Sequence, residues 1–301
     1  MRSKMNITVI GCGEVGYVYA QALFDAGYSL QLYTPRPNKK ILSFSTERNI
    51  FLHTEISEWI NCSDIVISCT PGSVLLDVTK EVIPFLKNGS IFADFSSASP
   101  DDKRDAALLS VSKKIMFVDV VIMGSIDLHK ASTPLIFAGN ETEKIVTLMK
   151  NIGATIRVLP DAKAGDAASL KLLRSVFMKG LSALTVQCTV AAQYYGVKEL
   201  LYEILSDLDK TSLAEFLDML LRNHVTHACR QRHEVAEATK QLKASGLPVT
   251  LLSAVEEIFA VTCELTKTHP IQNKNPTTKD ALIWLFENVK LNPTILKNQI
   301  F

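Results

Sequence analysis

The chain has 301 residues, with 32 lysines and arginines against 31 aspartates and glutamates, so its formal charge at pH 7 is +1. Hydrophobic residues make up 47% of the chain and charged residues 21%, which is typical of a globular protein and excludes a disordered one. The near-zero charge argues against a nucleic-acid-binding protein, because such proteins usually carry a basic excess. The length is sufficient for two domains of ~150 residues.

Cysteine spacing and apolar segments indicate the cellular compartment. The six cysteines show no paired spacing and no C-x-x-C, so the sequence predicts neither a zinc site nor a redox dithiol. No long apolar segment of the secretion-signal type stands at the N-terminus, and we expect a cytoplasmic protein. Residues 180–197 carry no charge, but their hydroxyl and amide side chains disfavour a membrane span. We expect a helix buried between domains or subunits, and no membrane partner.

In chain order, short apolar runs first alternate with helical segments, which predicts a parallel sheet covered on both faces. The predicted strands are 7–10, 29–33, 65–69, 90–93, 116–121, 134–138 and 155–159, and the predicted helices here include 14–26, 74–86 and 141–151. After Pro160 only helical segments follow, at 162–195, 213–223, 227–244, 248–268 and 278–289. We therefore predict an α/β domain over residues 1–160 and an all-α domain over residues 161–301, joined by a long interdomain helix.

A glycine-rich segment, Gly11-Cys12-Gly13-Glu14-Val15-Gly16, follows the first predicted strand and opens the first predicted helix. Glycines in this G-x-G-x-x-G spacing permit a tight turn and bring a pyrophosphate close to the helix N-terminus. The alternative is a turn that only packs strand against helix. The strand-and-helix setting favours a Rossmann-type dinucleotide site.

The end of the second predicted strand bears on the choice of cofactor. It reads Leu32-Tyr33-Thr34-Pro35-Arg36-Pro37, with Lys39 and Lys40 close behind, and it lacks the carboxylate that usually binds the ribose of NAD. Arg36 can bind a 2′-phosphate through charge-assisted hydrogen bonds, with Thr34 beside it. A solvated basic loop is the alternative. We predict NADP rather than NAD as the cofactor.

Three further motifs follow the glycine segment: Asp94–Pro100 (DFSSASP), Asp119–Ser125 (DVVIMGS) and Gly165–Lys171 (GDAASLK). In this order they are similar to D-x-S-T-x-x-P, D-A-P-V-S-G-G and G-x-G-x-x-x-K. With the glycine segment, they make the chain resemble the β-hydroxyacid dehydrogenase superfamily, which includes 3-hydroxyisobutyrate and 6-phosphogluconate dehydrogenases. The resemblance covers most of the chain.

The resemblance implies roles for single residues in the catalytic and substrate sites. Lys171 would be the general acid/base at the substrate hydroxyl, and Ser97 would lie beside the nicotinamide and the substrate. Gly124 and Ser125 would offer backbone N–H groups to the carboxylate of a small anionic substrate.

The resemblance also implies a cofactor channel and an activity. Cys69, Thr70 and Pro71 would line the channel for the ribose and the nicotinamide. The implied activity is hydride transfer between the nicotinamide and a small β-hydroxy acid or its keto form.

The uncharged helix over residues 180–197 and the helices after it have more apolar surface than one small domain can cover, so we expect a homodimer.

Three positions depart from the family motifs, at Met123, Ala167 and Arg174. The sequence from Ser169 to Gly180 is most similar to a sub-branch whose C-terminal domain has no known function. Two other functions therefore stay open, an imine reductase on the same scaffold and a catalytically silent NADP-binding protein. Because imine reductases commonly carry Asp or Tyr at the lysine position, Lys171 favours a hydroxyl substrate.

Helical spacing supports the assignment of Lys171 without the resemblance. Lys171 and Arg174 share a helix face, where a guanidinium, a cationic nicotinamide and apolar walls would disfavour the ammonium form of the lysine. Such an environment suits proton transfer near neutral pH. A solvated helix face is the alternative. His129, Tyr194 and Tyr195 are further candidates, the first as a substrate contact and all three as substitute proton carriers.

Histidines at 224, 227 and 233 suggest a metal site, but their spacing is not that of H-E-x-x-H. We interpret them as hydrogen-bonded or exposed histidines and predict no metal.

Overall fold

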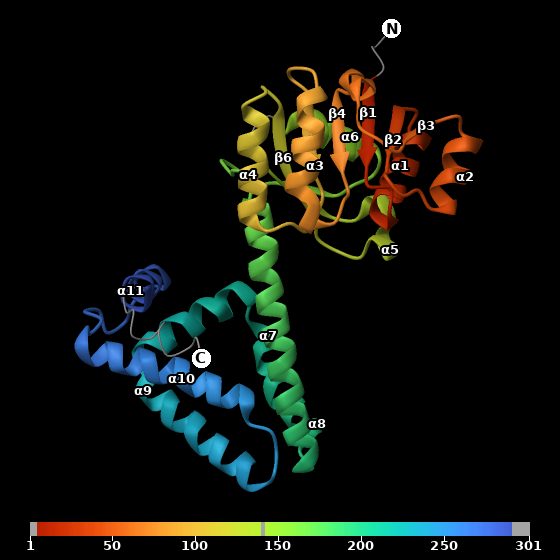
Figure 1. The fold of residues 1–301 in the computed structure, drawn as a ribbon. Coiled ribbons are helices and arrows are strands. Elements are labelled where there is room, and N and C mark those ends of the chain that lie inside the picture. Colours follow the sequence, from red (N-terminus) through yellow and green to blue (C-terminus); the bar gives the residue numbers. More distant parts are fainter. Residues whose placement is uncertain (1–4, 140–141, 291–301) are drawn as a thin grey trace. The chain divides into compact units, whose positions relative to one another are not determined.

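The computed structural model describes residues 5–139 and 142–290 and has two compact units, Met1–Val176 and Phe177–Phe301 (Figure 1). The first unit is an α/β domain, and the second is helical, as predicted. The units meet within one long helix, α7 (Asp166–Tyr194), which confirms the predicted helix between an α/β and an all-α region.

Within the described residues the first unit has an eight-stranded sheet in the order β3-β2-β1-β4-β5-β6-β7-β8. Its strands are β1 (Asn6–Ile10), β2 (Ser29–Tyr33), β3 (Phe51–His53), β4 (Ile65–Ser68), β5 (Ile91–Asp94), β6 (Met116–Ile122), β7 (Leu135–Ala138) and β8 (Ile156–Val158). The predicted parallel sheet is confirmed for β1 to β6, and one pairing departs from it, because β7 runs antiparallel to β6. Between these strands the chain forms only α5 (Ile126–His129) and a short 3-10 turn, Lys130–Ser132, and it reverses direction instead of crossing a face of the sheet.

Alternation along the central strands gives the sheet two apolar faces. In β1, Ile7 and Val9 belong to one core cluster, whereas Ile10 belongs to another. The first cluster includes side chains of α1 (Glu14–Asp25), α2 (Lys39–Glu47) and α6 (Glu143–Asn151). The second includes side chains of α3 (Leu75–Val82) and α4 (Pro100–Val111). Both faces are therefore covered, which is why apolar residues predominate on both faces of the central strands.

The sequence analysis did not identify several shorter elements. It did not identify β3, α2 or α4, and it gave a solvated basic loop as the alternative for the segment that contains Lys39 and Lys40. The structure places both lysines in the first turn of α2, whose N-cap Asn38 accepts a hydrogen bond from the backbone N–H of Ile41 (3.0 Å). That side-chain cap starts a helix whose buried face consists of only three residues, Ile41, Phe44 and Ser45.

The second unit contains the C-terminal part of α7, α8 (Lys198–Leu205), α9 (Leu213–Ala244), α10 (Thr250–Thr268) and α11 (Thr278–Lys290). The two helices predicted at 213–223 and 227–244 are one continuous helix, α9, so the predicted break was wrong. A capping box of Ser212 and Glu215 starts α9. The core of this unit is small and centres on Val225, Leu265 and Trp284.

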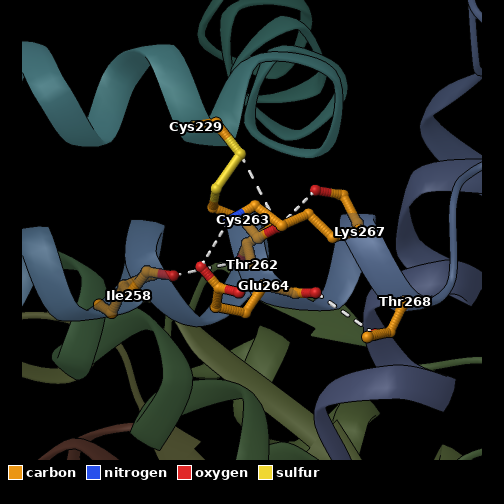
Figure 2. Close-up of a disulfide and its surroundings, with 8 residues drawn as sticks. Cys229, Ile258, Thr262, Cys263, Glu264, Lys267 and Thr268 are labelled. Carbon is orange, nitrogen blue, oxygen red and sulfur yellow. Dashed lines mark hydrogen bonds and ion pairs between the residues drawn. A yellow bond between two sulfur atoms is a disulfide. The ribbon is translucent and has the colours of Figure 1, made fainter.

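A disulfide joins α9 to α10, between Cys229 and Cys263, as Figure 2 shows. The sequence analysis found no paired spacing among the cysteines and did not predict this disulfide. Spacing rules find cysteines that are close in sequence, whereas these are 34 residues apart and meet because α9 packs along α10. The described part of the chain leaves Cys12, Cys62, Cys69 and Cys188 as free thiols.

The apolar residues of α7 are largely exposed in the single chain. Val186 is 60% exposed and Val190 50%, and most other side chains of the segment Phe177–Tyr194 are exposed as well. By length and composition alone α7 could span a membrane, and only 6% of the most apolar window of the helix is buried. The burial that we expected for this helix is therefore not supplied by the single chain.

Candidate functional site

The glycine-rich loop joins β1 to α1 in a tight turn that leaves no space for side chains at its two ends. Gly11 has a φ of +81°, and a Cβ there would lie 2.9 Å from the carbonyl of Cys69. A Cβ on Gly16 would overlap the carbonyl oxygen of Gly11. These two glycines therefore allow β1, α1 and the end of β4 to pack closely.

The middle glycine of the loop faces open space. A Cβ on Gly13 would meet no described atom within 4 Å. Gly13 is the N-cap of α1, and no described side chain accepts a hydrogen bond from the first turn of the helix. Unpaired N–H groups and the positive end of a helix dipole form the environment that a pyrophosphate requires. The loop therefore fits the pyrophosphate of a dinucleotide, which Gly11, Gly13 and Gly16 would bind through the backbone.

The thiols of Cys12 and Cys69 lie within or next to this loop. Burial raises the pKa of Cys12 to about 12, and burial likewise raises the pKa of Cys69 well above the ordinary value for a thiol. Both side chains are therefore neutral near pH 7 and act as small apolar groups rather than as nucleophiles. Cys69 also lines the cavity described below, together with the adjacent Thr70.

A pair of carboxylates lies at the mouth of the loop. The pKa of Glu14 is raised by a hydrogen bond and by like charge from Asp127, whereas the charges of Lys130 and Lys40 oppose this shift. Asp127 belongs to α5, so α5 lies near the start of α1. Because the pKa of Glu14 is raised, its carboxylate is neutralised more readily, which favours an anion at the loop.

The end of β2 presents the cationic groups that we predicted for a 2′-phosphate. The backbone N–H of Thr34 donates to the carbonyl of His53 (3.1 Å), which fixes the turn before the exposed Arg36. Within the described residues Arg36 forms no ion pair with a carboxylate. The ammonium of Lys40 lies 3.8 Å from the centre of the Tyr17 ring, a cation–π contact that joins α2 to α1.

A cavity of about 280 Å³ lies where the carboxyl ends of the central strands meet the first turn of α1 and the second turn of α7. Six of its lining residues were predicted as site residues: Val15, Cys69, Thr70, Ser97, Gly124 and Lys171. The sequence analysis did not assign the other four, Phe95, Ser96, Ile122 and Ile126. The motif positions next to Ser97 and Gly124 were the available signal, since each of these four residues adjoins a predicted site residue or lies two positions from one.

Other predicted residues do not line this cavity. Ser125 and His129 are exposed residues at the two ends of α5, where the backbone N–H of His129 donates to the carbonyl of Ser125 (3.2 Å). The ring of His129 nevertheless lies close to Gly124, since its Cδ2 would be 4.0 Å from a Cβ added there. Pro71 and Arg174 are also exposed and outside the lining.

Lys171 is half-buried at the base of the cavity, on the second turn of α7. Burial lowers its pKa, the positive charge of Lys103 lowers it further, and Asp119 acts in the opposite direction. The predicted direction of the shift is confirmed. The predicted cause was wrong in part, because the cation responsible is Lys103 and not Arg174.

Lys103 is a buried charged residue next to the site that the sequence analysis did not identify. It is fully buried and forms ion pairs with Asp94 (2.6 Å) and Asp119 (3.0 Å), the first residues of two of the motifs. The signal was its spacing from Ala106 and Ser110, which places all three on the buried face of α4. A lysine on a buried face requires a carboxylate partner.

The histidines considered for a metal site have other contacts. The Nε2 atom of His224 lies 2.8 Å from the hydroxyl of Thr262, its ring packs against Phe259, and burial lowers its pKa. In the described part of the chain no group of three potential metal ligands comes together.

Comparison with known proteins identifies the family. A model of the NAD-binding domain of 6-phosphogluconate dehydrogenase matches residues 6–159, which is half of the chain. The chain belongs to this family. It therefore has a dinucleotide-binding domain of the dehydrogenase type, which agrees with the resemblance drawn from the four motifs.

Individual relatives are more distant. An uncharacterized 28.5 kDa protein of Methanothermus fervidus is 26% identical over 255 residues, covering 85% of this chain and 98% of that protein. The mitochondrial 3-hydroxyisobutyrate dehydrogenase of Rattus norvegicus is 22% identical over 73% of this chain, which spans 63% of the rat protein's length. Among solved structures, an imine reductase variant from Myxococcus stipitatus in complex with NAD+ has a TM-score of 0.75 at 18% identity, covering 94% of this chain and 99% of that one. This last likeness shows the shared fold.

Proposed function

We propose that the protein is an NADP-dependent oxidoreductase that transfers a hydride between the nicotinamide and a small β-hydroxy acid or its keto form. The observation that carries this proposal is the cavity in which Lys171, with a lowered pKa, lies among Ser96, Ser97 and Gly124. Thr70 and Val15 extend the same cavity to the dinucleotide loop. A proton acceptor, hydroxyl groups and the cofactor loop thus share one small volume.

The proposed cofactor choice depends on Arg36. When bound, NADP would supply C4 of its nicotinamide as the hydride acceptor or donor. The glycine loop would bind the pyrophosphate, and Arg36 with Thr34 would bind the 2′-phosphate. No carboxylate stands at this end of β2 to repel that phosphate, which supports NADP over NAD.

The proposed proton transfer uses Lys171. In the oxidation direction the neutral amine takes the hydroxyl proton while the adjacent carbon loses its hydride to the nicotinamide. The backbone N–H groups of Gly124 and Ser125 would bind the substrate carboxylate, and Ser97 would orient the alcohol. The lowered pKa of Lys171 increases the fraction of neutral base near pH 7.

The decisive experiment replaces Lys171 by Met, which preserves volume and removes the proton acceptor. Hydroxy acids, keto acids, amines and cyclic imines would be screened with NADP(H) absorbance as the readout. We expect turnover of a hydroxy acid by the wild type, and a loss of about 10²–10⁴-fold in kcat for Lys171→Met, with the NADPH dissociation constant unchanged. Lys163→Met, at an exposed lysine before α7, is the matched control.

Other outcomes point to the two remaining functions. Turnover of imines alone would replace the proposal with an imine reductase, and tight NADPH binding without any turnover would indicate a silent binding protein. Near-wild-type turnover by Lys171→Met would refute the role of the lysine and direct attention to His129, Tyr194 or Tyr195.

We further propose that the protein is a cytoplasmic homodimer. The exposed apolar side chains along α7 and α8, such as Val190 and Ile204 (70% exposed), support an interface with a second copy. Light scattering should give twice the chain mass of 33.2 kDa. A mass near 33.2 kDa at micromolar concentration, or partition into lipid vesicles, would contradict this assembly.

A further inference from the structure

Lys103 is an unusual residue because its whole side chain is enclosed by protein. It lies on α4, in the first unit, and its ammonium group is 0% exposed. Removing an ammonium group from water is unfavourable unless opposite charges and hydrogen-bond acceptors surround it. A buried lysine that is retained at such a site therefore needs a structural or functional reason.

The ammonium group of Lys103 contacts three acceptors from two neighbouring strands. It is 2.6 Å from Oδ2 of Asp94 and 3.0 Å from Oδ1 of Asp119, and it donates a hydrogen bond to the backbone carbonyl of Asp94 (2.9 Å). Asp94 ends β5, and Asp119 lies within β6 beside it in register. Lys103 thus fixes the orientation of both carboxylates.

One of these carboxylates holds the first turn of α7. Oδ2 of Asp119 accepts hydrogen bonds from the backbone N–H groups of Gly165 and Ala168, both at 3.1 Å. Lys171 follows Ala168 by three residues, which places it on the next turn of the same helix. The orientation of Asp119 therefore sets where the helix that carries Lys171 begins.

The other carboxylate, that of Asp94, holds the loop of residues 95–99, here called the serine loop. Oδ2 of Asp94 accepts a hydrogen bond from the hydroxyl of Ser96 (2.7 Å), and that hydroxyl accepts one from the backbone N–H of Ala98 (3.2 Å). Ser96 and Ser97 line the same cavity as Lys171. The two sides of the cavity are thus connected through one ammonium group.

We propose that Lys103 is a positioning residue of the catalytic site, which aligns Lys171 with the serine loop through Asp119 and Asp94. This inference rests on the proposed function for its catalytic consequence. The alignment itself is a property of the described contacts. Lys103 does not touch the cavity and acts only through the two carboxylates and through its charge.

The charge of Lys103 provides a readout that a purely structural role would not move. The charged groups that act on Lys171 are Lys103 on α4, which lowers its pKa, and Asp119 on β6, which raises it. The thiol of Cys69, at the end of β4, also lines the cavity, but its raised pKa keeps it neutral. Replacing Lys103 by Met removes the cation and leaves Asp119 without its ion pair. The midpoint of Lys171 titration should therefore move upward.

The experiment measures this midpoint in the full-length protein by reductive methylation with ¹³C-formaldehyde and NMR titration. The Lys171 signal is assigned by its absence in Lys171→Arg. We expect a midpoint below that of an ordinary lysine in the wild type and an upward shift in Lys103→Met. Lys87→Met is the matched control, because Lys87 forms a half-exposed ion pair with Asp64 (2.6 Å) and should leave the midpoint unchanged.

A second variant covers the case in which Lys103→Met does not fold. The double variant Lys103→Met/Asp119→Asn removes both charges that act on Lys171, and the asparagine oxygen can still accept from Gly165 and Ala168. Its midpoint should lie above that of the wild type, because the charge of Lys103 acts on Lys171 more strongly than the opposing charge of Asp119. If folded protein of either variant titrates like the wild type, the proposal is overturned.

Turnover separates this inference from the proposed function. If the wild type oxidises a hydroxy acid, Lys103→Met or the double variant should lose at least 10-fold in kcat while the NADPH dissociation constant stays the same. A shifted midpoint without any wild-type turnover would refute the dehydrogenase proposal and support the alignment of Lys171 alone. An unshifted midpoint in an active enzyme would refute the role of Lys103 and leave the proposed function intact.

Discussion

Substitution of Gly13 by Ala tests the cofactor site directly, because it adds one methyl group where the protein has none. A Cβ at this position meets no described atom within 4 Å, and the backbone of Gly13 is extended, with φ −73° and ψ −154°. Alanine adopts this conformation readily. The free energy of unfolding should therefore change by no more than about 0.5 kcal/mol.

The same methyl group would occupy the space through which a pyrophosphate reaches the first N–H groups of α1. Overpacking of this kind costs about 1–3 kcal/mol, which corresponds to a roughly 5- to 150-fold increase in the dissociation constant for NADPH. Titration of NADPH fluorescence would measure the affinity, and circular dichroism during heating would measure the stability.

Two further glycines serve as comparisons for this experiment. Gly16→Ala should lose more than about 3 kcal/mol of stability, because its Cβ would overlap the backbone carbonyl oxygen of Gly11. Gly180→Ala, in α7 and also facing open space, should keep wild-type affinity and gain about 0.5–1 kcal/mol from the helix preference of alanine. Wild-type affinity in Gly13→Ala would show that no pyrophosphate lies at this loop, and the reasoning above would fail.

Three further predictions concern the cofactor, the pH profile and the disulfide. Arg36→Ala should weaken NADPH binding by about 1.5–3 kcal/mol, the usual contribution of a hydrogen bond to a charged group, while NADH binding is unchanged. Calorimetry with both cofactors would measure the two affinities, and tighter binding of NADH than of NADPH by the wild type would contradict the prediction. Because the pKa of Lys171 is lowered, its neutral form persists to lower pH. The value of kcat/KM for oxidation should therefore rise with pH to a plateau, and the midpoint of the rise should lie below the ordinary lysine pKa of about 10.4. A flat profile would exclude the lysine as the base. Cys229→Ser should lower the free energy of unfolding of the helical unit by about 3–4 kcal/mol at 25 °C, because the disulfide joins residues 34 positions apart and so closes a long loop in the unfolded chain. Cys188→Ser, at an exposed free thiol, is the control, and equal stability of the two variants would contradict the expectation.

Features that depend on neighbouring residues could be predicted from the sequence. The glycine loop is one, because the spacing of Gly11, Gly13 and Gly16 after an apolar strand already specifies a tight turn and an open helix N-terminus. The order of α/β and helical regions is another, since it follows from the change in hydrophobic period near Pro160. The helix position of Lys171 follows in the same way from the residues around it.

Features that depend on residues far apart in the chain could not be predicted. The antiparallel β7 depends on how the chain turns after β6, and the pairing of Cys229 with Cys263 depends on how α9 packs along α10. The continuity of α9 through the segment that contains Val225 comes from packing against Leu265 and Trp284. Local propensity contains none of this information.

The candidate site divides along the same line. The sequence by itself determined that the glycine loop and the motifs beginning at Asp94 and Asp119 would meet at the carboxyl edge of the sheet, because parallel strands that precede helices end there. The motif with Lys171 joins them only through the tertiary structure, since it follows β8, which runs antiparallel to β6. Only the tertiary structure decided which buried side chain contacts these motifs. Lys103 lies on a helix with no recognised motif, and its role exists because folding brings it within 3.0 Å of both Asp94 and Asp119 and so within electrostatic reach of Lys171. Coulombic interactions depend on distance in space and on burial, and neither quantity is set by the separation of residues along the chain.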